Sequence, residues 1–258
     1  MKRNALFSFT MLVVLGLACS STAPSPTPTA TFTPEPPTFT PSPTSTSTLT
    51  PTATPNLAAT AAFNATQEAG DVLTELDGFL ADTDIPYKDG HLAWKQDDKE
   101  VIRMQGPDGI FSPFAEDFDG GNFILKSDVT WNATGIIICG IIFRSEADQR
   151  LGAQYQFLFL RFSGAPAWAI EYHEFGEFRN SPTGVKYSSA VDLKNDATNQ
   201  VVIVAQNEVF TVFINGVRQG RYFDNSKQRE DGVLAFLGMQ DSGNGSCTYA
   251  NTTIWELK

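Results

Sequence analysis

The feature that most constrains the fold is a series of short apolar strands between residues 84 and 258, with turn residues between them and no helical pattern. About ten strands recur there, with turn signals roughly every 8–12 residues. The clearest turn is Asn215-Gly216, where both residues tolerate the positive φ of a two-residue hairpin. Parallel α/β folds are excluded because they need helices between their strands. The pattern therefore predicts an all-β sandwich or barrel.

Several of these strands can be placed individually. Residues 135–144 are apolar on both faces, which predicts a central strand. Besides the hairpin across Asn215-Gly216, two more are expected, one joining residues 91–94 to 101–104 and one joining 200–205 to 209–214. The other expected strands are residues 123–131, 155–162, 168–173, 217–223, 233–239 and 247–257.

The N-terminus carries a targeting signal. Lys2 and Arg3 precede an apolar run over residues 6–17, and Ala18-Cys19 follows. This order predicts a signal peptide over residues 1–19, since the run is well short of the roughly 20 apolar residues that span a bilayer. Residues 15–19 resemble the lipobox of bacterial lipoproteins, which implies a lipid on Cys19, although glycine stands at position 16 where leucine is usual. An ordinary secretory signal is the alternative.

Residues 20–56 have a different composition, with 10 of the 15 prolines, 13 threonines and 6 serines. Such a segment cannot bury enough apolar surface to fold, so it predicts a disordered stalk. Residues 57–83 then predict a helical segment, in which Val72, Leu76 and Leu80 share one face. That face can pack on the chain's own domain or bind a partner.

The charge and the cysteine content limit the cellular compartment and the classes of binding partner. The chain has 18 basic and 29 acidic residues and a net charge of −11, which argues against nucleic-acid binding. If Cys19 carries a lipid, Cys139 and Cys247 remain, and in an oxidising space they predict one disulfide. Two buried thiols are the alternative. We expect a secreted protein, attached by its lipid to the outer face of a bacterial membrane.

Several segments resemble the concanavalin A-like lectin/glucanase superfamily, and more narrowly its laminin-G-like jelly rolls. They are residues 117–118, 122–131, 140–144, 155–162, 199–216 and 231–236. The resemblance covers residues 117–258. It implies two stacked antiparallel sheets, often one of them concave, and so a jelly-roll β-sandwich over residues 84–258 behind the short N-terminal helical segment.

One branch of this superfamily acts on 3-keto-disaccharides, and its Gly-Ile/Val-x-Phe-Arg strand is similar to residues 140–145. That branch usually has Asn-Ser where this chain has Ile138-Cys139, so no catalytic role is carried over. The Glu-x-Asp-x-x-Glu sequence of the glucanase branch does not occur in this chain.

Sugar binding requires aromatic side chains that stack on apolar sugar faces and polar groups that bind hydroxyls. The expected ligand-binding residues are Arg144, Trp168, Tyr172, His173 and Phe175. Packing in the core is an equally open interpretation of Trp168 and Tyr172, and core positions are expected for Trp131 and Trp255. A hydrolytic carboxylate pair among Glu171, Glu174 and Glu177 is the enzymatic alternative.

No cofactor or metal site is predicted. A structural calcium ion is an alternative at two oxygen-rich loops, one with Asp117, Asp119 and Gly120-Gly121 and one with Asp224, Asn225 and Asp231. The sequence thus predicts a lipid-anchored extracellular binding module that recognises carbohydrate and is not an enzyme. A glycoside-active enzyme of the 3-keto-disaccharide hydrolase type and a structural or adhesion protein that binds other proteins are the alternatives.

Overall fold

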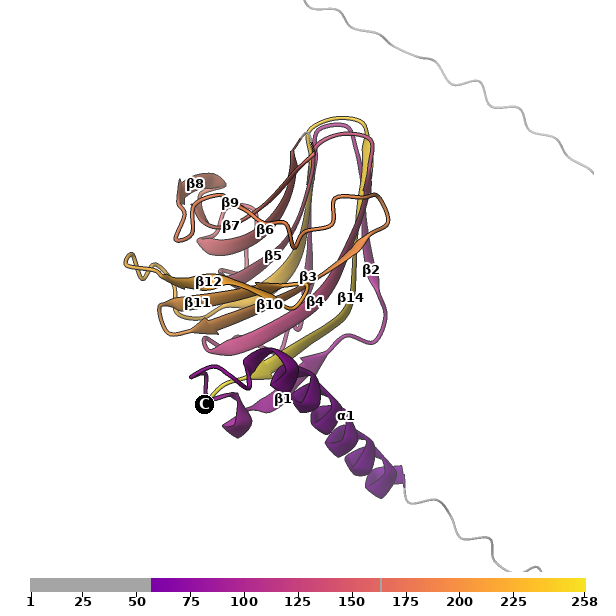
Figure 1. The fold of residues 1–258 in the computed structure, drawn as a ribbon, viewed down its shortest axis with the longest axis vertical. Coiled ribbons are helices and arrows are strands. Elements are labelled where there is room, and N and C mark those ends of the chain that lie inside the picture. Colours follow the sequence, from indigo (N-terminus) through magenta and orange to yellow (C-terminus); the bar gives the residue numbers. More distant parts are fainter. Residues whose placement is uncertain (1–56, 163) are drawn as a thin grey trace, which may run out of the picture. The chain divides into compact units, whose positions relative to one another are not determined.

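The computed structural model describes residues 57–162 and 164–258, and within them it contains one α-helix, a short 3-10 helix and two antiparallel β-sheets packed face to face (Figure 1). The predicted β-sandwich with an N-terminal helical segment is confirmed. The predicted signal peptide, Cys19 and the predicted stalk lie outside the described residues.

Each sheet has seven strands. Sheet A runs in the order β1-β14-β4-β10-β11-β12, with β2 also paired to β14, and sheet B runs in the order β3-β13-β5-β6-β7-β8, with β9 also paired to β7. The strands of sheet A are β1 (His91–Lys95), β2 (Glu100–Gln105), β4 (Phe123–Ala133), β10 (Thr198–Gln206), β11 (Val209–Ile214), β12 (Val217–Phe223) and β14 (Asn244–Glu256). The strands of sheet B are β3 (Asp108–Phe114), β5 (Ile137–Ser145), β6 (Gln154–Phe162), β7 (Ala165–Glu174), β8 (Glu177–Asn180), β9 (Lys186–Tyr187) and β13 (Val233–Gln240).

The strongest local signals predicted their elements correctly. Asn215 and Gly216 both have positive φ and join β11 to β12, and β10 pairs with β11 as expected. The doubly apolar strand β5 lies inside sheet B, between β13 and β6. Trp131 and Trp255 are buried, as predicted.

The predicted hairpin between residues 91–94 and 101–104 is wrong. Strands β1 and β2 do not pair with each other, because both pair with β14 and lie end to end along it. The register of β14 against β4 shifts between Ala250 and Thr253, and Gln96 binds the backbone of Thr252 at this irregularity through two hydrogen bonds of 2.8 and 3.1 Å. The link between β1 and β2 therefore passes the irregularity in β14 and does not reverse the chain.

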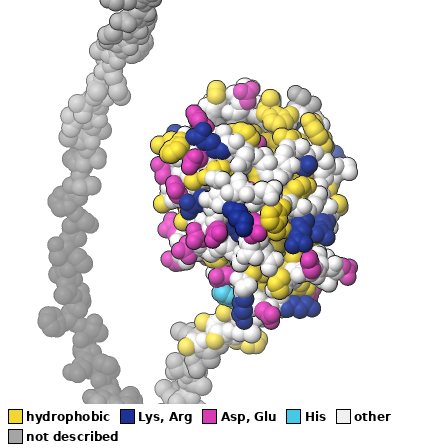
Figure 2. All heavy atoms as spheres, turned by 90° about the vertical axis from the view of Figure 1, so that its left-hand side faces the viewer, with side chains coloured by type: hydrophobic (Ala, Val, Ile, Leu, Met, Phe, Trp, Pro, Cys, Tyr) yellow, Lys and Arg dark blue, Asp and Glu magenta, His cyan; other side chains and the backbone are white. Residues whose placement is uncertain are grey.

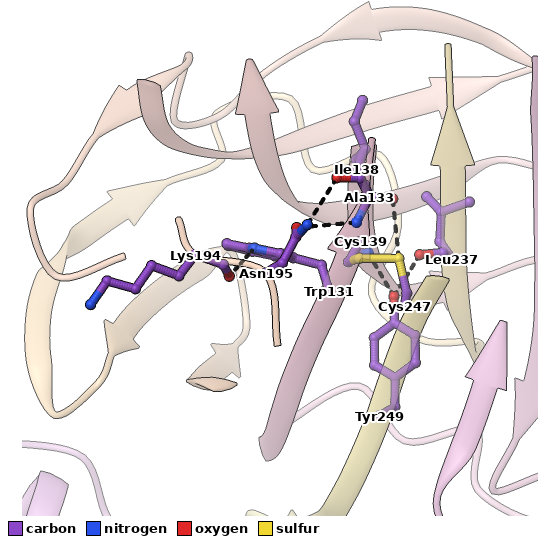
Figure 3. The surroundings of a disulfide bond; sticks show 10 residues. Trp131, Ala133, Ile138, Cys139, Lys194, Asn195, Leu237, Cys247 and Tyr249 are labelled. Atoms are coloured by element: carbon purple, nitrogen blue, oxygen red, sulfur yellow. Dashed lines mark hydrogen bonds between the residues drawn. A yellow bond between two sulfur atoms is a disulfide. The ribbon is translucent and has the colours of Figure 1, made fainter. Parts of the chain in front are cut away.

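A disulfide joins the two sheets through the core. Cys139 of β5 and Cys247 of β14 are bonded, which confirms the predicted pairing (Figure 3). Beside it, the buried hydroxyl of Tyr249 accepts a hydrogen bond from the Gly140 N–H and donates one to the Leu237 carbonyl, so the two sheets are also linked by polar contacts. A buried disulfide indicates folding in an oxidising, extracytoplasmic compartment.

One continuous helix, α1 (Leu57–Leu80), covers part of the outer face of sheet A. Val72, Leu76 and Leu80 pack on Val202, Trp255 and neighbouring residues of the sheet, so the predicted apolar face binds its own domain. After α1 the chain makes the 3-10 helix η1 (Tyr87–Asp89), where the Tyr87 hydroxyl donates a hydrogen bond to Asp77; this bond, together with burial, raises the pKa of Tyr87 to about 12.

An ion pair also holds α1 to the sheet. The Lys126 side chain is 7% exposed and its ammonium contacts the Glu75 carboxylate of α1, which is half exposed. We expect Glu75→Gln to lower the free energy of unfolding by about 1–2 kcal/mol, because a buried ammonium then loses its charged acceptor. Urea unfolding measures this loss. Glu68→Gln is the matched control: Glu68 meets the exposed Lys95 at 3.4 Å, and its loss should cost about 0.5 kcal/mol or less. Equal costs for the two variants would contradict the account.

The strands of both sheets bend in the same sense, so that the outer face of sheet B is concave and the side of sheet A that carries α1 is convex (Figure 1). In the part of the chain that the structure describes, no helix is long and apolar enough to cross a bilayer.

Candidate functional site: the concave face of sheet B

Four polar side chains form a block on the concave face. Along β6, Tyr155 and Phe157 point into the core, so Gln154 and Gln156 point outward. Along β7, Tyr172 points into the core, so Glu171 and His173 on either side of it point outward by the same alternation. The cross-strand pairs are Gln154 with His173 and Gln156 with Glu171. We call these four residues the polar block.

Hydrogen bonds orient most of the polar block. The His173 imidazole and the Glu171 carboxylate meet at 2.9 Å. Gln154 contacts the Ser145 hydroxyl at 3.1 Å and donates to the Gln149 carbonyl at 2.8 Å. The floor beside the block is apolar, with buried residues of β5, β6, β7 and β13: Ile142, Leu158, Leu160, Ala167, Ala169, Ala235 and Leu237.

Gln156 is the exception within the block. Its side chain is buried, and its amide oxygen has no hydrogen-bond partner. A buried acceptor left unpaired costs about 1–3 kcal/mol. The terminal torsion of a glutamine is soft, so a small rotation can turn this oxygen toward a ligand on the concave face. A ligand hydroxyl would then supply the missing donor.

Exposed aromatic rings border the same face along its β7 edge. Phe178 of β8 pairs with His173, its ring lies 6.0 Å from the imidazole, and it is 54% exposed. Tyr187 of β9 pairs with Ala167 and is 73% exposed. Their partners His173 and Ala167 are six residues apart along β7, so the backbone positions of the two aromatic residues are separated by about 20 Å along the edge.

The residues expected from the sequence to bind ligand do not form one site. Trp168 and Tyr172 share a face, as alternation implied, and that face is the core: Trp168 stacks on Phe157, and burial raises the pKa of Tyr172. His173 lies in the polar block. Phe175 is exposed in the β7–β8 turn, where the Arg179 guanidinium lies 5.8 Å from its ring.

Arg144 lies at the end of β5 and contacts none of the other four. Its guanidinium is buried, lies 5.5 Å from the Phe210 ring, and donates to the main-chain carbonyls of Gly121, Asn207 and Arg229. These bonds tie together three loops at one end of the sandwich.

Each carboxylate considered for hydrolysis already has a side-chain partner. Glu171 pairs with His173, while Glu174 and Glu177 both pair with Arg179, at 3.6 and 3.1 Å. In the loops considered for calcium, Asp224 is buried and accepts hydrogen bonds from Tyr155 and Ser226. Across residues 57–162 and 164–258, no group of three or more His, Cys, Asp or Glu residues is placed to hold a metal ion.

The ligand-binding residues expected from the sequence did not include Gln154, Gln156, Phe178 or Tyr187. A signal for the two glutamines was present, because the alternation Gln154-Tyr155-Gln156-Phe157 places both on the face opposite the aromatic residues. Nothing in the local sequence indicates that this face is concave or that β8 and β9 supply its edge, since both depend on pairing with β7.

No protein-family model matches the chain, and no curated protein does. Among solved structures, a carbohydrate-binding module from Bacillus subtilis, CBM66, is 16% identical with a TM-score of 0.48, covering 61% of this chain and 86% of the module. A β-glucanase from Bacillus licheniformis is 10% identical with a TM-score of 0.43 (62% and 79% covered), and sheep galectin-11 is 8% identical with a TM-score of 0.40 (58% and 98% covered). Similarity at this level assigns neither ligand nor reaction to this chain.

Proposed function

We propose that this protein is an extracellular carbohydrate-binding module that holds its ligand on the concave face of sheet B. The observation that carries the proposal is the polar block, in which a carboxylate, an imidazole and two amides stand together beside the exposed Phe178 ring. Sugar hydroxyls hydrogen-bond to planar polar groups of this kind, and the apolar face of a sugar ring stacks on an exposed aromatic ring.

The proposed activity is binding without cleavage. Glu171 is hydrogen-bonded to the His173 imidazole, Glu174 and Glu177 pair with Arg179, and the sequence lacks the glucanase carboxylate motif. We further propose that residues 1–19 act as a lipoprotein signal with lipid on Cys19, and that the Pro/Thr-rich segment over residues 20–56 is a stalk that holds the module away from the membrane.

Gln156→Leu tests the proposal through two readouts, of which ligand affinity should fall and stability should not. A glycan array probed with residues 55–258, which form one compact unit, identifies a ligand with and without calcium. We expect Gln156→Leu to weaken binding of that ligand about tenfold, because an amide that binds a hydroxyl is lost. Stability should stay the same or rise, because the variant also removes an unpaired buried oxygen.

Gln105→Leu, at an exposed position of β2 in sheet A, is the matched control and should change neither affinity nor stability. A blank array in both conditions, or equal affinity in the Gln156→Leu variant, would overturn the proposed site.

A further inference from the structure

A hollow of about 430 Å³ lies at one end of the sandwich. We call it the end pocket. Its walls come from residues 121–122 ahead of β4, from the β10–β11 turn, from the loop over residues 224–231 and from the end of β14, and Arg144 of β5 also lines it. No residue of the polar block lines it, so the end pocket is separate from the concave-face site.

Two buried groups of opposite charge lie at the end pocket, Arg144 and Asp224. A guanidinium has five N–H donors. Arg144 makes four hydrogen bonds, all to main-chain carbonyls, which leaves one N–H uncommitted and no carboxylate in direct contact with the charge. Burial lowers the pKa of Arg144, while nearby groups that include Glu230, Asp224 and Asp231 act in the opposite direction.

The rim of the end pocket mixes both signs of charge. Lys227 lies 3.5 Å from Glu208, and Arg229 lies 3.3 Å from Glu146 outside the pocket. Glu230 is an exposed carboxylate on the rim. Acidic and basic side chains likewise lie side by side over the face in Figure 2.

This charge arrangement selects among ligand classes. Five carboxylates outnumber three cations around the pocket, which disfavours an anion, whereas the buried guanidinium disfavours a cation. A hydroxyl group both accepts and donates hydrogen bonds. It can accept from the free N–H of Arg144 and donate to a carboxylate on the rim, so a neutral polyhydroxy ligand satisfies both kinds of group at once.

The backbone around the end pocket is unusual as well. Arg144, Asn207 and Lys227 all have positive φ, of 49°, 50° and 46°. The left-handed region is uncommon for residues other than glycine, and asparagine tolerates it better than arginine or lysine does. Strained backbone of this kind gathers at ligand-binding sites, where the surrounding structure holds it in place.

We propose that the end pocket is a second binding site, independent of the concave face, which takes one neutral saccharide unit, either a free monosaccharide or the terminal unit of a glycan. Its hydroxyls accept from the uncommitted Arg144 N–H and donate to Glu230. The site does not depend on the proposed function of sheet B.

Titration of the purified protein with neutral hexoses, glucuronate and glucosamine, followed by amide chemical shifts in NMR, tests the proposal. We expect a neutral hexose to shift the amides of Gly121, Asn122, Asn207 and Glu208, whether or not those of Gln156 and His173 also shift, because the two sites are independent. Glu230→Gln should weaken this binding about tenfold, since a charge-assisted hydrogen bond is lost. Glu116→Gln, an exposed carboxylate outside the pocket, is the control and should have no effect.

Three results would overturn the proposal. Shifts confined to the polar block would place all sugar binding on the concave face, and would leave the proposed function of sheet B intact. Tighter binding of glucuronate or glucosamine than of any neutral hexose would make the end pocket a site for ions. Hexose affinity unchanged by Glu230→Gln would remove the assigned contact.

Discussion

Replacing both disulfide cysteines, as Cys139→Ala with Cys247→Ala, is expected to lower the free energy of unfolding by about 4–5 kcal/mol. The bond closes a loop of 108 residues, and a cross-link over so long a loop removes much of the entropy of the unfolded chain. Domains are stable by about 5–15 kcal/mol, so the double variant should be close to unfolding at 37 °C. Urea unfolding followed by tryptophan fluorescence measures the loss.

Chemical reduction of the disulfide gives a second test of its contribution to stability. Both cysteines are fully buried, so reductant should act slowly on the folded protein and quickly once urea unfolds it. The reduced natural chain should then unfold at the same urea concentration as the double variant. A loss below about 1 kcal/mol would mean that the other inter-sheet contacts hold the sandwich without the bond.

Trp168→Ala should be nearly as destabilising, at about 3–5 kcal/mol, because it opens a large cavity in the core. The indole is fully buried, stacks on Phe157 with 6.1 Å between ring centroids, and meets Tyr222 edge-on at 5.6 Å. Its N–H has no hydrogen-bond partner, so Trp168→Phe, which removes that N–H and keeps a ring, should cost clearly less.

Phe175→Ala is the matched control for Trp168→Ala. Phe175 is 68% exposed, and its truncation should change the unfolding free energy by no more than about 0.5 kcal/mol. If Trp168→Ala left stability unchanged, the side chain would have to lie outside the core. Any loss of ligand binding in Trp168→Ala must therefore be compared with the folded fraction before it is assigned to a contact.

Local sequence chemistry predicted much of the fold and little of the site. Asn215-Gly216 forms its turn because the backbone preference is local, and the apolar run of β5 could only be a buried strand. The predicted hairpin between β1 and β2 was wrong because both strands pair with β14, which lies about 150 residues further along the chain.

Alternation showed that Trp168 and Tyr172 share a face, but it cannot decide which face of a strand meets the core. That depends on the neighbouring strands and on the opposite sheet. The polar block likewise depends on strand pairing: Gln156 and Glu171 lie on consecutive strands and meet because β6 pairs with β7. The rim of Phe178 and Tyr187 depends on the pairing of β8 and β9 with β7.

A crystal structure of the protein with its strongest array ligand tests the central claim most directly. We expect a sugar on the concave face, with hydroxyls bonded to Gln156 and Glu171 and one ring face against Phe178. The Gln156 amide oxygen, which lacks a partner in the free protein, should accept a hydrogen bond from the ligand. A ligand found on the convex side or against α1, with the polar block empty, would contradict the account.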